Sequence, residues 1–392
     1  MRSPWLWVPT LFAAGEVPVT LIAFVSLLMF LQVGGSPALA TLCCGCLFLP
    51  SALVVMLRGK VINLSRYRRQ IQLAELAMVV ALMLLALAFT WSSFNALWLF
   101  ALLLLLSLLS AWHGLASRQF YACTLRQQER RLWRRVAMFF SQAAVIFTYG
   151  LVLMFVGALQ VVYRSIRLAW GQGCYIAAGV LLLFALWHLV ALPREATEYA
   201  PGRQQSVRWT RPFLSLFVLM LPQSLMFFSR VLFLFAPSSR GGLGCTLQDV
   251  AFAQGAVGVI GFSLGLALGR GLYEDKRFWA MAVALGLSPC VYVVMVAVPP
   301  QSLLALSLGT FTAQLLFGFG LPSCSPFLRQ LGGGRRLDLS LVSAAMFLPC
   351  VVSGWLVEAL GFGAFFAVDA SLALVSWLTL WLTGARRECH ER

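Results

Sequence analysis

Long apolar stretches follow one another along almost the whole chain, with mostly short polar segments between them. Counting runs of about 18 or more apolar residues bounded by charged, glycine, proline or other polar positions predicts twelve spans. They cover approximately residues 6–33, 37–57, 70–91, 94–114, 136–160, 174–192, 212–236, 247–269, 277–298, 301–322, 338–359 and 363–384. Because about 20 apolar residues cross a bilayer as a helix, the pattern predicts an all-α polytopic membrane protein with twelve transmembrane helices.

The first apolar run, residues 5–34, carries polar and helix-weakening residues in its middle. No small-residue cleavage site follows a short hydrophobic region, so we expect a retained first transmembrane helix. Gly15 and Pro18 weaken the helical hydrogen bonds on either side of Glu16. A carboxylate inside a membrane is costly enough to indicate a functional site. The alternative is that Glu16 lies near the cytoplasmic end of the helix and is hydrated.

The distribution of basic residues predicts the orientation of the chain. The formal net charge is +16. With the N-terminus inside, 25 of the 29 lysine and arginine residues fall on the cytoplasmic side, as the positive-inside rule requires. We therefore expect both termini in the cytoplasm, and basic loops that face anionic membrane lipid rather than nucleic acid.

The composition argues against an enzyme. Hydrophobic residues make up 61% of the chain and charged residues 11%, against about 25% charged in soluble domains. The sequence contains three histidines and lacks Gly-x-Ser-x-Gly, phosphate-loop and His-Glu-x-x-His motifs. The ten cysteines show no zinc or haem spacing, and those at Cys43, Cys44 and Cys46 suit helix packing. We expect no catalysis, cofactor or bound metal.

A polar segment at residues 193–211 separates the sixth predicted span from the seventh. It divides the chain into a six-helix N-terminal half, residues 1–192, and a six-helix C-terminal half, residues 212–392. This 6+6 division is typical of the major facilitator fold, in which a solute binds near the midplane between the halves and the halves rock to give alternating access.

Five stretches of the chain form a recognisable series: residues 4–18 (PWLWVPTLFAAGEVP), 111–121 (AWHGLASRQFY), 187–194 (WHLVALPR), 249–261 (DVAFAQGAVGVIG) and 353–362 (SGWLVEALGF). They resemble, in the same order, stretches of the AmpG-type anhydromuropeptide permeases, a branch of the major facilitator superfamily. The resemblance runs through nearly the whole chain. It implies proton-coupled uptake of a muropeptide or similar sugar-peptide across the bacterial inner membrane, by a protein that we expect to be a monomer.

The chain departs from that family at several acidic positions. Gly114 and Arg118 stand where a His-Asp-x-x-x-Asp-Gly-Phe-Tyr arrangement is usual, and residues 221–224 and 312–314 are uncharged where the family carries charge. The loop at residues 58–60 also lacks the superfamily's aspartate. If the missing carboxylates carry protons or bind the sugar-peptide, this chain uses other groups or has lost the function.

Ionisable and polar side chains in the apolar spans are the candidate binding or coupling residues. Arg230 lies deep in the seventh span and needs an anion or water, with Glu16 as the first partner to test and snorkelling to the outer interface as the alternative.

The amide and phenol groups that suit sugar hydroxyls and peptides are those of Gln142, Tyr149, Gln223, Gln254 and Gln314. Each of these is individually more typical of an interhelical hydrogen bond. His113 and His188 lie at predicted cytoplasmic helix ends, which favours an interfacial position over a proton role.

The sequence therefore favours a secondary transporter, with Glu16 as the coupling group. Two alternatives stay open: a non-transporting scaffold or partner subunit derived from the same fold, and an exporter of amphipathic compounds.

The glycines Gly255, Gly258, Gly261, Gly265 and Gly269 predict close helix packing in the eighth span. Cys174 and Cys245 both fall at the predicted outer face, where a disulfide is conceivable.

Overall fold

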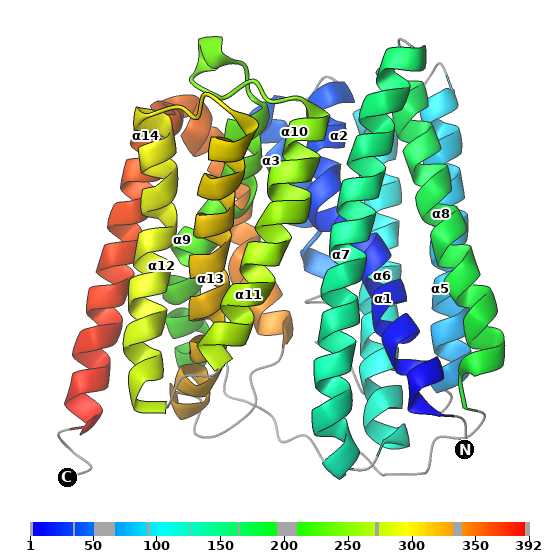
Figure 1. Ribbon diagram of the computed structural model, residues 1–392, viewed down its shortest axis with the longest axis horizontal. Helices are drawn as coiled ribbons and strands as arrows, with labels where there is room; N and C mark the ends of the chain where they lie inside the picture. Colours follow the sequence, from blue (N-terminus) through cyan, green and yellow to red (C-terminus); the bar gives the residue numbers. More distant parts are fainter. Residues whose placement is uncertain are drawn as a thin grey trace. The chain divides into compact units, whose positions relative to one another are not determined.

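The computed structural model describes residues 3–33, 36–50, 67–91, 95–125, 127–163, 165–193, 210–270, 274–331 and 339–388. Every regular element within these ranges is a helix (Figure 1). The chain divides into two compact units: Met1–Gly35 with Cys46–Ser206, and Ser36–Gly45 with Val207–Arg392.

The first unit contains the helices that precede the central polar segment, apart from most of α3. They are α1 (Val8–Thr20), the π-helical turn η2 (Leu21–Val25), α2 (Ser26–Val33), α5 (Tyr67–Thr90), α6 (Ala96–Thr124), α7 (Gln127–Tyr163) and α8 (Ile166–Ala191), after a short 3-10 turn at Pro4–Leu6. Three of them lie side by side, with α5 packed against both α6 and α8, while α1 packs against α7. The long apolar segments thus form an antiparallel helical bundle in which polar side chains meet in the interior.

The second unit contains the remaining helices. They are α3 (Pro37–Cys46), α9 (Thr210–Phe235), the short 3-10 helix η3 (Ser238–Arg240), α10 (Leu247–Val250), the π-helical η4 (Ala251–Gly258), α11 (Val259–Arg270), α12 (Glu274–Ala297), α13 (Leu303–Leu331) and α14 (Leu339–Glu388). Inside α14, Gly361 has a φ of 74°, a left-handed conformation that glycine adopts without a Cβ clash. This residue separates α14 into the last two predicted spans.

The prediction of twelve helical spans is confirmed, with differences at the ends. Seven helical segments of the described ranges are long and apolar enough to cross a membrane, and three shorter apolar helices accompany them. Helix α6 continues to Thr124, past the predicted end of its span, and α8 begins at Ile166, before the predicted start of its span. In α6 the charged Arg118 is exposed on one face while the opposite face is buried, so this charge does not end the helix. The predicted linker at 193–211 falls almost wholly outside the described residues, so that boundary stays a prediction.

Glycines bring α11 and α13 into backbone contact. A Cβ atom added at Gly265 would lie 2.1 Å from the carbonyl oxygen of Leu315, and one at Gly269 would lie 2.3 Å from that of Phe319. Neither distance leaves room for a side chain. The prediction that this glycine series serves close helix packing is confirmed at Gly261, Gly265 and Gly269.

Helix α3 is joined to α14 by polar contacts within the second unit. The Gly354 amide donates to the Thr41 hydroxyl oxygen at 3.2 Å, and the Ala38 amide donates to Oε1 of Glu358 at 3.1 Å. The second bond satisfies a free N–H at the start of α3. This part of the second predicted span therefore belongs to the unit built mainly from later helices.

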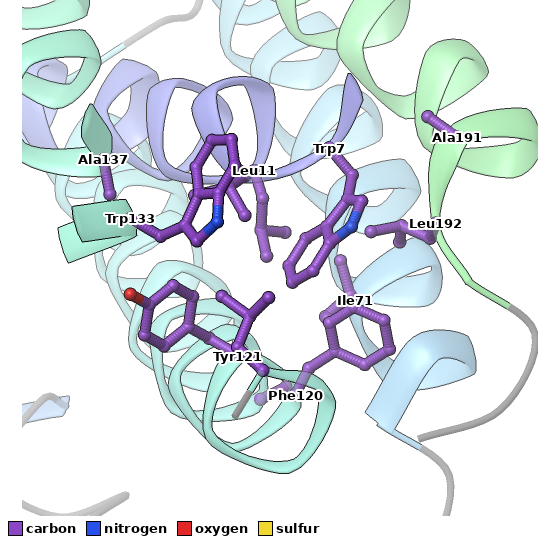
Figure 2. Packing of buried hydrophobic residues seen from close by; sticks show 12 residues of the cluster. Trp7, Leu11, Ile71, Phe120, Tyr121, Trp133, Ala137, Ala191 and Leu192 are labelled. Atoms are coloured by element: carbon purple, nitrogen blue, oxygen red, sulfur yellow. The ribbon is translucent and has the colours of Figure 1, made fainter. Parts of the chain in front are cut away.

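An apolar cluster closes the first unit at the end where α1 begins (Figure 2). Trp7 and Leu11 of α1 are fully buried in it, and the Trp7 ring meets Phe120 of α6 edge to face at 5.2 Å. Ile71 of α5, Trp133 of α7 and Leu192, just after α8, also belong to the cluster. The cluster thus joins α1, α5, α6, α7 and α8 at this end of the unit.

Candidate functional site

Three ionisable side chains meet inside the first unit. Oε1 of Glu75, on α5, lies 2.7 Å from Nδ1 of His188 on α8 and 3.1 Å from Nε2 of His113 on α6. All three side chains are buried, at 0% exposure for Glu75 and His188 and 1% for His113. An ionised carboxylate in such a place needs hydrogen-bond donors, and the two imidazoles supply them.

A fourth helix completes this cluster through Thr10 of α1. The Thr10 hydroxyl lies 3.0 Å from Nε2 of His188 and 3.2 Å from the carbonyl oxygen of Trp7. Helix α5 holds the last turn of α8 by the backbone as well, since Nε2 of Gln72 donates to the His188 carbonyl at 3.3 Å and the Arg68 guanidinium donates to the Leu189 carbonyl at 2.8 Å. The position of the His188 ring is thus fixed from both sides.

Some polar atoms of the cluster have no hydrogen-bond partner in the described ranges. They are Oε2 of Glu75 and Nδ1 of His113, both buried. Nδ1 of His113 faces the backbone of Gly15, where an added Cβ would lie 3.4 Å away. The Ser117 hydroxyl lies 3.5 Å from the other ring nitrogen of His113. Because Gly15 has no side chain, the His113 ring can lie against the backbone of α1, but Gly15 offers no hydrogen bond to Nδ1.

Both histidines are buried in the protein, while their predicted position at the membrane interface stays a prediction. His113 lies well inside α6, which continues past the predicted end of the span, and His188, although in the last turn of α8, is covered by α1 and α5. Glu75 was not among the residues that the sequence pointed to. The argument made for Glu16, a carboxylate in an apolar span, applies equally to Glu75 and would have found it.

Glu16 lies in α1 near a different neighbour. Its carboxylate accepts a hydrogen bond from the Ser141 hydroxyl of α7, and the positive charge of Arg118 on α6 lies close enough to interact with it. The side chain is half-buried. Arg230, its predicted partner, belongs to the other unit, so a Glu16–Arg230 pair stays a prediction.

Arg230 is buried in α9, with 5% of its surface exposed. Its guanidinium carbon lies 5.2 Å from the centre of the Phe227 ring, a cation–π contact. The charge also interacts with Tyr292 of α12 and Cys350 of α14, and Tyr292 in turn interacts with Gln314 of α13. The structure thus brings two of the predicted residues, Arg230 and Gln314, to the same tyrosine, and the burial of Arg230 disfavours snorkelling.

The other predicted polar residues are spread over the two units. Gln142 is half-buried and Tyr149 fully buried on α7, while Gln223 on α9 and Gln254 in η4 are buried. Oε1 of Gln254 has no hydrogen-bond partner among the described residues. An amide oxygen in that position is free to accept a bond from a solute.

Further titratable groups lie apart from these sites. Asp369 in α14 is fully buried, and neither of its carboxylate oxygens has a hydrogen-bond partner in the described part of the chain. Cys174 and Cys245 are free thiols. A search of the described residues finds no group of three histidine, cysteine, aspartate or glutamate residues arranged to hold a metal ion.

Comparisons by sequence find no relative. No model of a protein family matches the chain, and no curated protein matches it.

Comparison by structure finds similar solved proteins along almost the full length. The nucleoside transporter NupG superposes with a TM-score of 0.73 at 14% identity, over 97% of this chain and 99% of that one. An inward-open structure of the xylose transporter XylE from E. coli gives 0.69 at 12% identity, over 95% and 94%. A bacterial homolog of the human lysosomal transporter Spinster gives 0.65 at 14%, over 95% and 92%.

These similarities define the fold class: the chain is a multi-pass, all-α membrane protein with the major facilitator superfamily fold. The similar structures are those of transporters with this fold, and none of those named is an anhydromuropeptide permease.

Proposed function

We propose that this protein is a secondary transporter that moves a small polar solute by alternating access. The observation that carries the proposal is the similarity to solved transporters over nearly the whole of both chains. The buried Glu75–His113–His188 cluster and the buried Arg230 support it, because ionisable groups inside apolar spans are costly and are typical of solute or proton pathways.

A sugar-peptide related to the muropeptides is the proposed solute, taken up together with protons. This rests on the sequence resemblance to anhydromuropeptide permeases. The side chains proposed to contact it in the first unit are Glu16, Gln142 and Tyr149, and those in the second are Gln223, Arg230, Gln254 and Gln314. Amides and a phenol suit sugar hydroxyls and peptide groups, and a guanidinium suits a carboxylate of the peptide.

The bacterial inner membrane is the proposed location, with both termini in the cytoplasm. The support is the charge distribution, since 25 of the 29 basic residues fall on one side of a twelve-span topology. The basic segments would lie against anionic lipid.

Thermal unfolding of the purified protein in detergent tests the proposal directly. A disaccharide anhydromuropeptide that binds only the folded state stabilises it by about 2.7 kcal/mol at a hundredfold excess over Kd. We expect a concentration-dependent rise of the unfolding midpoint that is reduced in Arg230→Gln and Glu16→Gln. The control is Glu129→Gln, at an exposed position on α7, which should respond as the parent does.

Uptake of the same compound into proteoliposomes then tests transport. Accumulation against a gradient supports the proposal. A lack of binding and uptake with this and related sugar-peptides contradicts the proposed solute and favours the exporter or the scaffold. Efflux of amphipathic compounds from the same proteoliposomes distinguishes those two.

A further inference from the structure

We propose that Glu75, His188 and Thr10 form a proton-binding site whose occupancy is communicated to the first turn of α1. The proton is shared by the carboxylate of α5 and the imidazole of α8. Its role in driving transport rests on the proposed function, whereas the binding of the proton and its effect on α1 do not.

The hydrogen bonds of a neutral His188 can all be satisfied. Nδ1, at 2.7 Å from Oε1 of Glu75, then carries the ring hydrogen and donates it to the carboxylate. Nε2 is left as an acceptor, and the Thr10 hydroxyl at 3.0 Å donates its single hydrogen to it. In this state the hydroxyl makes no bond with the backbone of its own helix.

A doubly protonated His188 is satisfied equally well by the same atoms. Nδ1 still donates to Glu75, and Nε2 now donates to the Thr10 oxygen. The hydroxyl hydrogen turns to the Trp7 carbonyl, which lies 3.2 Å away. A buried site that keeps every ring nitrogen bonded in both protonation states avoids the cost of an unmade hydrogen bond in either.

His113 does not offer this exchange. Its Nε2 donates to Glu75 at 3.1 Å, but the buried Nδ1 faces Gly15 and has no partner within the described ranges. A proton added there would leave a charged donor buried and unpaired, which is strongly unfavourable. His113 is therefore a positioning residue that holds the Glu75 carboxylate toward His188.

The helices packed around His188 carry other charged groups among the described side chains. On α5 these are Glu75 itself, Arg68, which is bonded to the Leu189 carbonyl, and the exposed Arg69. On α6 they are His113 and the exposed Arg118, on α1 the half-buried Glu16 bonded to Ser141, and on α7 the exposed Glu129. Glu75 is the group that faces the imidazole directly.

Thr10 connects the buried pair to the rest of the molecule. It is partly exposed, whereas Glu75, His113 and His188 are buried. The apolar cluster around Trp7 lies at the start of α1 (Figure 2). The indole of Trp187, next to His188, donates to the Leu6 carbonyl at 2.7 Å, so the first turn of α1 is already attached to α8. A second contact between α1 and α8 is the hydrogen bond between Thr10 and Nε2 of His188. Protonation of His188 makes Nε2 the donor of this bond and lets the Thr10 hydroxyl donate to the Trp7 carbonyl.

Histidine-selective NMR of the full chain in detergent tests the site. The chain has three histidines, His113, His188 and His390, so His113→Gln, His188→Gln and His390→Gln assign the three sets of ring nitrogen signals. We expect Nδ1 of His188, which faces Glu75, to carry a hydrogen whether or not the site holds the additional proton, and Nε2, which faces Thr10, to carry one only when it does. Signals that place the additional proton on His113, or a hydrogen on Nε2 of His188 without one on Nδ1, would overturn the proposal.

Substitutions of Thr10 test the exchange at Nε2. Hydrogen bonds from a charged donor are about twice as strong as neutral ones, so Thr10→Val should lower the ratio of doubly to singly protonated His188 at a given pH by about tenfold. Thr10→Ser keeps the hydroxyl and should restore the parental ratio. Equal ratios in the parent and both variants would remove Thr10 from the site.

Proteoliposomes separate this inference from the proposed function. With anhydromuropeptide as the probe, His188→Gln should lose accumulation driven by a pH gradient while retaining exchange of labelled for unlabelled compound. If the parent transports nothing, the proposed solute fails and the NMR result stands by itself. If His188→Gln accumulates the compound as the parent does, transport is established and the coupling role of the site is wrong.

Discussion

Oε1 of Glu75 lies 2.7 Å from Nδ1 of His188, although 113 positions separate the two residues in the chain. The pair connects α5 to α8 in the interior of the first unit. Because neither side chain has exposed surface, the contact is not screened by solvent, and removing one member leaves the other in a place where water cannot replace it.

Glu75→Ala is expected to destabilise the protein by about 3 kcal/mol, the cost of removing one partner of a buried hydrogen-bonded ionic group. Both His113 and His188 lose the acceptor of a ring N–H, so their donors become unsatisfied. The unfolding midpoint in detergent measures the effect. Gln248→Ala, at an exposed position on α10, is the control and should change stability by no more than about 0.5 kcal/mol. Equal midpoints for the two variants would mean that the cluster contributes nothing to folding.

The number and position of the spans could be predicted because each depends on local apolarity. The Glu75 cluster could not, because it depends on the register of four helices that the chain brings together from residues far apart. Glu75 follows several polar residues in a span that the sequence places from about residue 70, and nothing local shows that α8 covers it. The burial of His113 was not predicted for a related reason, since the predicted span ends at residue 114 whereas α6 continues to Thr124.

The hydrogen-bond partners of individual polar residues also could not be predicted from the sequence. Glu16 stood out as an intramembrane carboxylate, but its bond to Ser141 depends on how α7 packs against α1. The glycine series of the eighth span was predictable, because small residues at helical spacing have the same consequence wherever the neighbouring helix lies.

Gly265→Ala is expected to disrupt the contact between α11 and α13. The new Cβ would lie 2.1 Å from the Leu315 carbonyl oxygen, so the two backbones would have to separate. Overpacking of this kind costs about 1–3 kcal/mol. Gly179→Ala in α8 is the matched control: no atom lies within 4 Å of the added Cβ, and alanine is favoured over glycine inside a helix by about 0.5–1 kcal/mol. The two midpoints should therefore move in opposite directions, and a parallel change would contradict the packing.

Thr41→Val is expected to loosen α3 from α14. The hydroxyl that accepts the Gly354 amide at 3.2 Å is lost, while the volume of the side chain is kept. A buried N–H left without an acceptor costs about 1–3 kcal/mol. Thr41→Ser retains the acceptor and should lose much less. If Thr41→Val leaves the unfolding midpoint unchanged, the hydrogen bond from the Gly354 amide contributes nothing to the contact.

Cys245 is expected to react slowly with thiol reagents near neutral pH. Partial burial, together with the charge of Asp249, raises the pKa of this thiol to about 11, so the reactive thiolate is scarce below that pH. The labelling rate should rise about tenfold for each pH unit between 7 and 10. Asp249→Asn removes the negative charge, lowers the pKa of the thiol and should speed labelling at every pH in this range. Peptide mass spectrometry after timed alkylation resolves Cys245 from the other cysteines, and an unchanged rate in Asp249→Asn would assign the slow reaction to burial alone.

Asp369→Asn is expected to stabilise the protein, the opposite sign from Glu75→Ala. Both acids are fully buried, but Glu75 accepts bonds from two imidazoles, whereas neither oxygen of Asp369 has a partner in the described part of the chain. An unsatisfied buried group costs about 1–3 kcal/mol, and more when it is charged, so an uncharged amide of the same shape removes part of that cost. The unfolding midpoint should rise, while Ser371→Ala, at an exposed position of the same helix, should leave it unchanged. A large loss of stability in Asp369→Asn would show that the carboxylate is paired in the folded protein, because only a bound donor or cation makes the charge worth keeping.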